Sequence, residues 1–318
     1  MEKTKKFELH ILVVSLFFFA FVLSVILQQQ EQAKRIALCN QAHSALVQKT
    51  FAPVFSALQA KSAYVYNFSK NAPLYGKSDT EVRPLASLTK LMTARLAQKS
   101  VLPTSEYTIA SHDLDSDGFV GFVVGDTYHI ADLFAGALIA SSNDSAVMLA
   151  RSTKLSDTDF VTHMNTEAAQ IGLPSLHFAN PTGLDIENDT VATAYGSAHD
   201  ILMLLHKNYV DFPELMSLSV RPTMTISATN GRSILLKNTD LVIDKLPLLL
   251  ASKTGYTDVA GGNLAVLWRE PSGDILGASV LGSTETGRFD DMVAIHDAAD
   301  NFVAGIHTLP QFCKSLSI

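Results

Sequence analysis

The chain has 318 residues, 47% of them hydrophobic, and a formal net charge of −7. This composition excludes a wholly disordered chain, and the length allows one large domain or two moderate ones. An acidic balance without a long basic run argues against nucleic acid as a partner. The only cysteines, Cys39 and Cys313, lie near opposite ends, which excludes a disulfide-rich scaffold and leaves open whether the two pair.

Residues 1–28 have the pattern of a membrane anchor. Three lysines precede the uncharged run ILVVSLFFFAFVLSVIL at residues 11–27. A signal peptide has an apolar core of roughly 7–15 residues and a small-x-small cleavage site, whereas this run is longer and QQQEQAKR follows it. We therefore expect an uncleaved signal anchor, with a cleaved signal peptide as the alternative. Lysines before the run predict a cytoplasmic N-terminus, so that the chain after residue 28 lies outside the cytoplasmic membrane.

The rest of the chain predicts a helical stalk followed by a mixed domain. Residues 29–58 are rich in Ala and Gln, which favours helix. Strand patterns follow at residues 62–68 and 72–77, mostly helical patterns at 83–209, four further strand patterns at 221–284, and a last helix at 287–306. This order predicts an α+β fold for residues 59–310: an antiparallel sheet flanked by helices, with an inserted all-helical lobe.

Two polar residues stand out in the helical stretch RPLASLTKLMTARLA. Ser87 and Lys90 are three residues apart and are therefore neighbours on a helix. Serine is a weak nucleophile that needs a base, and lysine serves as one only when burial or nearby positive charge lowers its pKa. The backbone N–H groups of a helix start can stabilise an oxyanion. Taken alone, the pattern is common and fits an exposed Ser and Lys on an amphipathic helix.

Two further segments carry possible site residues. In ASSNDSA, Ser141 and Asn143 alternate before a helix, where a hydroxyl can relay a proton and a carboxamide can bind a substrate amide. In ASKTGYT, Lys253 and Thr254 offer a cation and a hydroxyl to a substrate carboxylate, and Gly255 leaves room for an extended peptide along an edge strand. Each segment alone is also explained by ordinary helix capping or an ordinary strand.

The three segments together are far more specific than each one alone. Ser-x-x-Lys, Ser-x-Asn and Lys-Thr-Gly in this order are the signature of penicillin-binding proteins and related β-lactamases. The surrounding stretches RPLASLTKLMTA, GDTYHIADLFAGALIASSNDSAVMLA, NPTGLD, SKTGYTDVAGGNLA and GSTETGRFDD resemble the serine-type D-alanyl-D-alanine carboxypeptidases. These are the low-molecular-mass penicillin-binding proteins of the β-lactamase/transpeptidase-like superfamily. The resemblance covers residues 62–306.

The resemblance implies a serine acyl-transfer enzyme without metal or cofactor, with its active site between the lobes. Its partners would be a peptidoglycan stem peptide ending in D-Ala-D-Ala and β-lactams as covalent inhibitors. By this resemblance Ser87 attacks the carbonyl between the last two D-alanines, Lys90 takes its proton, and Ser141 passes a proton to the leaving amine. The oxyanion hole would be formed by the backbone N–H groups of Ser87 and Tyr256.

The resemblance also implies the substrate-binding residues. Asn143 would hold the backbone amide of the substrate, and Lys253 and Thr254 would face its terminal carboxylate. Gly255 would line the groove, and Arg288 matches an arginine of the family that assists with the carboxylate.

This sequence departs from the family pattern at two points. The middle motif has Ser142 where the family usually has glycine, which is expected to narrow or stiffen the turn. The membrane anchor is N-terminal, whereas many relatives carry a C-terminal amphipathic helix and a second, β-rich domain.

Three other functions compete with a carboxypeptidase. A D,D-endopeptidase that cuts peptidoglycan crosslinks would use the same residues. A class A β-lactamase needs a Glu-x-x-Leu-Asn loop, which we do not find, and a silent wall-binding module would not need six intact site residues. The stretch DLDSDGFVGFVV begins like a calcium loop, but Val124 replaces the glutamate that such a loop needs at its twelfth position.

Overall fold

The computed structural model describes residues 2–114, 120–186, 191–306, 309 and 313. It divides into two compact units, one made of Met1–Thr50 with Asn301–Ile318 and the other of Phe51–Asp300. The larger unit therefore begins within the residues predicted to form the stalk.

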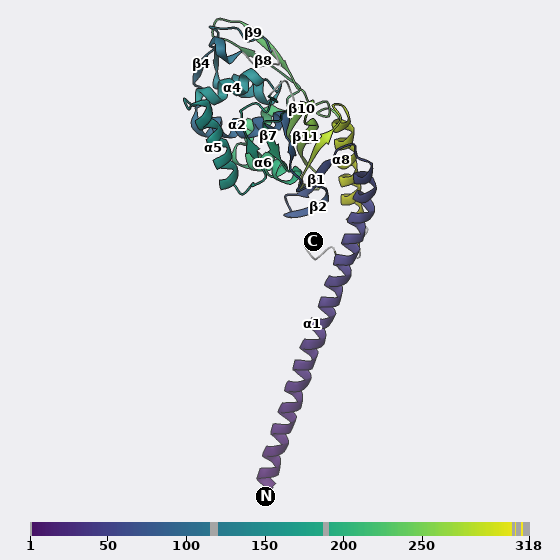
Figure 1. Cartoon of the computed structure of the whole chain (residues 1–318). Helices are drawn as coiled ribbons and strands as arrows, with labels where there is room; N and C mark the ends of the chain where they lie inside the picture. The colour runs from purple at the N-terminus through teal and green to yellow at the C-terminus, as the bar shows by residue number, and fades with distance from the viewer. Residues whose placement is uncertain (1, 115–119, 187–190, 307–308, 310–312, 314–318) are drawn as a thin grey trace. The chain divides into compact units, whose positions relative to one another are not determined.

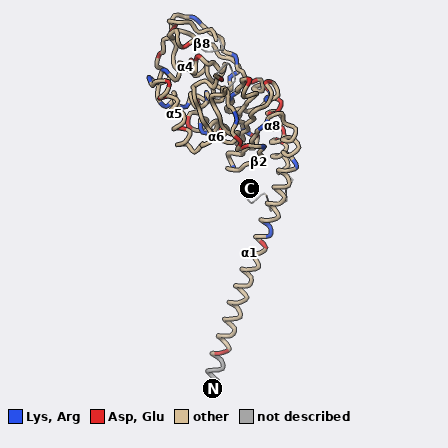
Figure 2. The backbone as a smooth tube through the Cα atoms, viewed as in Figure 1, with Lys and Arg blue, Asp and Glu red and all other residues tan. Residues whose placement is uncertain are grey.

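The smaller unit is built on the first part of helix α1 (Glu2–Ala57), which continues without a break through the predicted anchor and stalk (Figure 1). Figure 2 shows no charged residue on α1 between Glu8 and Glu31. Phe17, Phe18 and Phe19 are 68–73% exposed, so no protein surface covers this apolar stretch. Among the described residues, α1 is the one helix that is long and apolar enough to cross a membrane.

A disulfide joins the two chain segments of the smaller unit. Cys39 on α1 and Cys313 are bonded, with 5.3 Å between their Cα atoms. The His43 and Phe302 rings also meet edge to face, with their centroids 5.5 Å apart. The pairing that the sequence left open is therefore present.

The larger unit contains a five-stranded antiparallel sheet in the order β10-β11-β12-β1-β2. The strands are β1 (Ser62–Asn67), β2 (Ala72–Lys77), β10 (Leu249–Thr257), β11 (Gly261–Arg269) and β12 (Ile275–Ser283). Neighbouring residues of a strand point to opposite faces. On one face of the sheet, Trp268 contacts His296 of α8 (Gly287–Ile306). On the other face, Leu267 and Leu202 of α6 (Ala198–Asp211) both lie next to Gly277. Helices thus cover both faces of the sheet, and β10 is an edge strand.

A mostly helical lobe is inserted between β2 and β10. Its helices are α2 (Lys90–Ser100), α3 (Ile130–Leu138), α4 (Asn143–Ser152), α5 (Asp157–Gln170) and α7 (Pro213–Ser217), with the short 3-10 turns η1 (Ala86–Thr89), η2 (Ser111–Asp113) and η3 (Leu218–Val220). α2 lies at the centre of the lobe: Leu91, Met92 and Ala94 are fully buried against other helices.

The lobe also contains short strands: β3 (Arg83–Pro84), β4 (Glu106–Thr108), β5 (Thr127–His129), β6 (His177–Phe178), β7 (Ala194–Gly196), β8 (Thr223–Ser227) and β9 (Ser233–Lys237). Strands β3–β7 are too short to give a period-2 pattern, and they lie in a stretch whose sequence predicts mostly helix. β8 and β9 were predicted as strands, but they form a separate hairpin outside the main sheet.

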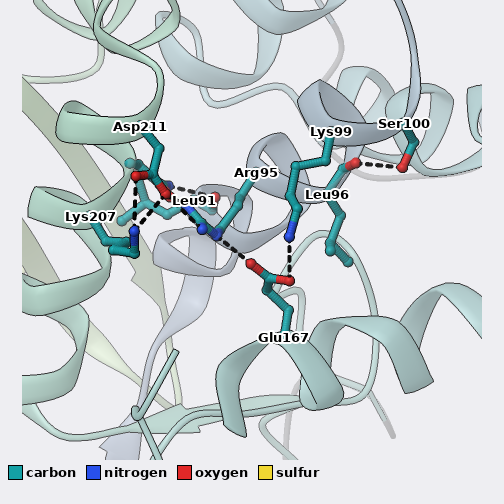
Figure 3. Close-up of polar contacts among 9 residues, drawn as sticks. Leu91, Arg95, Leu96, Lys99, Ser100, Glu167, Lys207 and Asp211 are labelled. Carbon is teal, nitrogen blue, oxygen red and sulfur yellow. Dashed lines mark hydrogen bonds and ion pairs between the residues drawn. The ribbon is translucent and has the colours of Figure 1, made fainter. Parts of the chain in front are cut away.

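A partly buried ion network links α2 and α5 of the lobe with α6 (Figure 3). Arg95 of α2 donates to Glu167 of α5 at 2.7 Å and to Asp211 of α6 at 2.8 Å. Lys99 reaches the other Glu167 oxygen at 2.7 Å, and Lys207 pairs with Asp211. Burial alone raises the pKa of Glu167, but the hydrogen bonds from Lys99 and Arg95 outweigh it, so that the net pKa is lowered. The network therefore fixes α2, whose first residue is Lys90.

Candidate active site

Ser87 lies in the turn η1, directly before α2. Ala86 has a φ of +49°, a left-handed conformation that costs energy for a residue other than glycine and is often found at functional sites. Ser87 is partly exposed, whereas Lys90 is fully buried. Their side chains meet, with 2.7 Å between Lys90 Nζ and Ser87 Oγ. The spacing of three residues thus brings the partly exposed Ser87 hydroxyl into contact with the buried Lys90 amine.

The environment of Lys90 favours the neutral amine. Burial lowers the pKa of Lys90 well below its ordinary 10.5, and the charge of Lys253 lowers it further. A neutral amine has two N–H bonds and one lone pair. Besides Ser87, its partners are the Asn143 Oδ1 atom at 2.7 Å and the Thr182 carbonyl at 2.9 Å, which are both acceptors. If its two N–H bonds are donated to Asn143 and Thr182, the lone pair of the neutral amine faces Ser87 Oγ.

The loop that carries the Thr182 carbonyl is held tightly against η1. Asn180 Oδ1 accepts the backbone N–H groups of Thr182 and Gly183, at 3.1 and 2.7 Å. Gly183 has a φ of +78°, and a Cβ there would lie 2.0 Å from the Ala86 carbonyl oxygen. Only glycine combines this backbone conformation with this close approach.

The Ser-x-Asn segment forms the turn between α3 and α4. Ser141 has a φ of +55°, and Asn143 is the first residue of α4. Ser142 is the N-cap: its hydroxyl accepts the backbone N–H of Ser145 at 3.1 Å. Serine is a preferred N-cap residue, so Ser142 gives this turn a hydrogen bond that glycine cannot provide.

The Lys-Thr-Gly segment lies on the edge strand β10, next to this turn. Lys253 Nζ donates to Ser141 Oγ at 2.7 Å and to the Thr254 carbonyl at 2.8 Å. Burial and the charge of Arg288 lower the pKa of Lys253 to about 7, although Asp240 opposes the shift. The Thr254 hydroxyl is hydrogen-bonded to the Thr239 hydroxyl at 2.5 Å.

Gly255 also has a structural role, in addition to the substrate-binding role that the sequence predicts. A Cβ at Gly255 would lie 2.9 Å from the Leu85 carbonyl oxygen and 3.2 Å from the Ser87 nitrogen. Its missing side chain thus lets β10 run directly alongside η1. Arg288, from the start of α8, donates to the Gly255 carbonyl at 2.9 Å and lies over the Tyr256 ring.

All three sequence motifs therefore meet in one place, but some of the residues that hold them together were not predicted. Thr182 acts through its backbone, which no side-chain pattern reveals. Thr239 and Asp240 lie in an Asn-Thr-Asp stretch outside the three motifs.

In the calcium-like segment, the described aspartate has a structural role. Asp113 is buried and accepts hydrogen bonds from Arg151 at 2.8 Å and from Tyr107, so it serves the packing of the lobe. Asp115 and Asp117 lie outside the described residues. Within the described part of the chain, no group of three or more His, Cys, Asp or Glu side chains is placed to hold a metal ion.

Comparison with known proteins places this geometry in a family. Residues 47–281 match the peptidase S11 family model, described as D-alanyl-D-alanine carboxypeptidase. The chain is 28% identical over 210 residues to the D-alanyl-D-alanine carboxypeptidase DacF of Bacillus subtilis, covering 64% of this chain and 52% of that protein. It is 30% identical over 214 residues to a D-alanyl-D-alanine endopeptidase of Pseudomonas aeruginosa, covering 66% of this chain and 67% of that protein. The chain thus spans about half the length of the first relative and two thirds of the second.

Solved structures support the same assignment. The ampicillin-bound penicillin-binding protein D2 of Listeria monocytogenes superposes with a TM-score of 0.66 at 26% identity, over 76% of this chain and 98% of that one. A D-alanyl-D-alanine carboxypeptidase of Mycobacterium tuberculosis shares the fold, with a TM-score of 0.69 at 24% identity over 79% of this chain and 92% of that one. The predicted α+β fold is confirmed, and the chain belongs to the D-alanyl-D-alanine carboxypeptidase family of serine peptidases.

Proposed function

We propose that this protein is a membrane-anchored serine D,D-carboxypeptidase that removes the terminal D-alanine from peptidoglycan stem pentapeptides. The proposal rests on the buried Lys90 amine. Two of its hydrogen-bonding partners, Asn143 Oδ1 and the Thr182 carbonyl, are acceptors, and its third contact is with Ser87 Oγ. This arrangement supplies a nucleophile with its base.

The first half of the reaction forms an acyl-enzyme. Ser87 Oγ attacks the carbonyl carbon of the penultimate D-alanine, and its proton moves to Lys90 Nζ. The backbone N–H groups of Ser87 and Tyr256 stabilise the oxyanion. The C–N bond breaks as the proton held by Lys90 passes through the Ser141 hydroxyl, positioned by Lys253, to the leaving amine, so that D-alanine departs and Lys90 is neutral again. In the second half, Lys90 takes a proton from the water that attacks the ester carbonyl, and returns it to Ser87 Oγ as the ester bond breaks.

The positive charges of the site suit the end of the substrate. Lys253 and Thr254 bind the terminal carboxylate, with Arg288 behind them, and Asn143 binds the backbone amide. Because β10 is an edge strand, the stem peptide lies along it as an added strand.

A D,D-endopeptidase is the second candidate. Endopeptidases of Pseudomonas aeruginosa and Haemophilus influenzae are 30% and 29% identical to this chain, which covers 67% and 70% of their lengths. The coverage of the carboxypeptidase DacF is 52%. The same site would cut a crosslink if the groove admits a second stem peptide beyond the D-alanine.

The long apolar helix and the disulfide support a location on the outer side of the cytoplasmic membrane. The apolar run of α1 anchors the chain, and the catalytic unit follows the membrane span. Disulfides persist mainly in oxidising compartments outside the cytoplasm, which agrees with the Cys39–Cys313 bond.

The test uses the full-length chain in detergent with two substrates. A pentapeptide ending in D-Ala-D-Ala is expected to release free D-alanine, faster than a crosslinked dimer of stem peptides is cut. Faster cleavage of the dimer would establish the endopeptidase instead. Cleavage of neither substrate would contradict both.

A further inference from the structure

Asp240 is a buried acid beside the site that none of the sequence motifs includes. It lies between β9 and β10, and its side chain is only 5% exposed. The Ser252 hydroxyl donates to its Oδ2 atom, and the backbone N–H of Val242 donates to Oδ1 at 2.9 Å. A buried carboxylate is costly unless it is compensated by hydrogen bonds and opposite charge, so its presence here needs a reason.

The Thr239–Asp240 connection touches both sides of the active site. The Thr239 N–H donates to the carbonyl of Ile139 at 3.2 Å, just before the Ser141 turn. Its hydroxyl is hydrogen-bonded to that of Thr254. Asp240 holds Ser252, which directly precedes Lys253 on β10. Through these bonds the connection sets the position of both the Ser141 turn and the carboxylate-binding strand.

Asp240 interacts with two buried positive charges. Lys253 of β10 and Arg288 of α8 are both less than 10% exposed. Burial and the charge of Arg288 both lower the pKa of Lys253, whereas Asp240 raises it. Burial raises the pKa of Asp240, whereas the hydrogen bonds from Ser252 and Val242 and the charges of Arg288 and Lys253 oppose the rise and favour its carboxylate form. It is therefore the negative charge that opposes a cluster of buried cations.

We propose that Asp240 is a positioning residue of the carboxylate pocket, which keeps Lys253 a cation and fixes β10 through Ser252. The inference rests on the proposed carboxypeptidase activity. It adds a residue outside the three motifs and assigns that residue a specific effect, namely preference for substrates with a free terminal carboxylate.

A charged Lys253 has two consequences. It attracts the terminal carboxylate of the substrate directly. Its charge also helps to keep Lys90 neutral, and therefore able to take the Ser87 proton. Loss of the negative charge at Asp240 should weaken both effects.

The first test compares two pentapeptides, one ending in D-Ala-D-Ala and one in D-Ala-D-alaninamide. In Asp240→Asn the ratio of kcat/KM for the acid to that for the amide is expected to fall about tenfold, with KM for the acid rising. A purely structural defect would lower both values together and leave the ratio unchanged. Asp244→Asn is the matched control, because Asp244 is an exposed acid in the same connection.

The second test does not depend on activity. NMR of full-length protein with ¹³Cε-labelled lysine follows the titration of Lys253, assigned through Lys253→Arg. In Asp240→Asn the Lys253 midpoint is expected to fall by about one pH unit. Ser252→Ala should shift it the same way by less, because Asp240 loses a hydrogen bond that favours its charged form. Ser252→Ala carries the test if Asp240→Asn does not fold.

The outcomes separate this inference from the proposed function. A Lys253 midpoint that stays within 0.2 pH units, roughly the change expected in Asp244→Asn, would overturn the role of Asp240. An unchanged acid-to-amide ratio in an active Asp240→Asn enzyme would do the same. If the wild type releases no D-alanine while the midpoint still shifts, the proposed function fails and the electrostatic role of Asp240 stands.

Discussion

At Lys90 the chemistry depends on a single lone pair. The amine donates to two acceptors, Asn143 and the Thr182 carbonyl, and a third hydrogen would have only Ser87 Oγ as its partner. Burial removes the water that would otherwise stabilise the ammonium form. Lys90 is thus prepared to accept a proton before any substrate arrives.

Replacing Lys90 tests its role as the base. Lys90→Met keeps the length of the side chain but cannot accept a proton, so the rate of acylation by a fluorescent penicillin is expected to fall about 10²–10⁴-fold. The thermal unfolding midpoint shows whether the variant is folded. Lys99→Met on the same helix is the control and should acylate within about twofold of wild type. Normal acylation by Lys90→Met would mean that another group is the base.

The two lysines also predict the pH dependence of the enzyme. The free enzyme needs neutral Lys90, so kcat/KM for the pentapeptide should rise with pH through the lowered pKa of Lys90. It also needs charged Lys253, so kcat/KM should fall again as the pH rises past about 7. In Lys253→Arg the falling limb should move to higher pH, because arginine keeps its charge. A falling limb at the same pH in wild type and Lys253→Arg would assign it to another group.

At the scale of residues, the sequence was most informative where side chains do the chemistry. Ser87 and Lys90 are recognisable because their spacing on a helix is fixed, and Lys253 because it belongs to a motif. The Thr182 carbonyl could not be predicted, since every residue has a carbonyl and only the fold selects one. Asp240 was missed because its partners, Val242 in the turn that follows it and Ser252 on β10, are brought together by a turn whose conformation the sequence does not reveal.

At the scale of elements, the contact between η1 and the loop of residues 180–184 is the most sensitive part of the site. Gly183 and Gly172 have nearly the same φ, +78° and +77°, but only Gly183 faces a close neighbour. Alanine at either position meets the same backbone cost of about 1–2 kcal/mol. Gly183→Ala adds a clash with the Ala86 carbonyl.

We therefore expect Gly183→Ala to lower the free energy of unfolding by at least about 1 kcal/mol more than Gly172→Ala does. It should also slow acylation, because the loop carries the Thr182 carbonyl that binds Lys90. Gly172→Ala should leave acylation unchanged. Chemical denaturation and penicillin labelling measure the two effects, and equal results for both variants would show that the close approach has no role.

The ion network of α2, α5 and α6 gives a second prediction at this scale (Figure 3). Glu167→Gln removes one of the two carboxylates that pair with the buried Arg95, and breaking a buried ion pair typically costs about 3–5 kcal/mol. Lys207→Met breaks a half-exposed pair and should cost less than about 1 kcal/mol. Urea unfolding of both variants compares them directly. A cost below 1 kcal/mol for Glu167→Gln would mean that the network does not hold α2 in place.

Elements with strong hydrophobic periods were predicted well. The strands β1, β2, β11 and β12 and the last helix lie where the patterns placed them. The hairpin β8–β9 shows what such patterns cannot predict. Alternating apolar and polar residues identify a strand, but they do not identify the strand with which it pairs. Residues 223–227 and 233–237 pair with each other and not with the main sheet, and this choice depends on the surrounding lobe.

At the scale of the whole molecule, the disulfide can be checked in the native protein. Cys39 and Cys313 are 274 residues apart in sequence. Protein purified from membranes should take up no iodoacetamide under denaturing conditions until it is reduced, and two equivalents afterwards. Mass spectrometry measures this uptake. Two free thiols before reduction would contradict both the bond and the inferred oxidising location.

The central claim is that Ser87 forms an acyl-enzyme with Lys90 as its base. Full-length protein incubated with a fluorescent penicillin should carry one covalent label, and mass spectrometry of its peptides should locate the label on Ser87. Ser87→Ala should fold and carry none. Absence of label on the wild type, or undiminished label on Ser87→Ala, would contradict the claim.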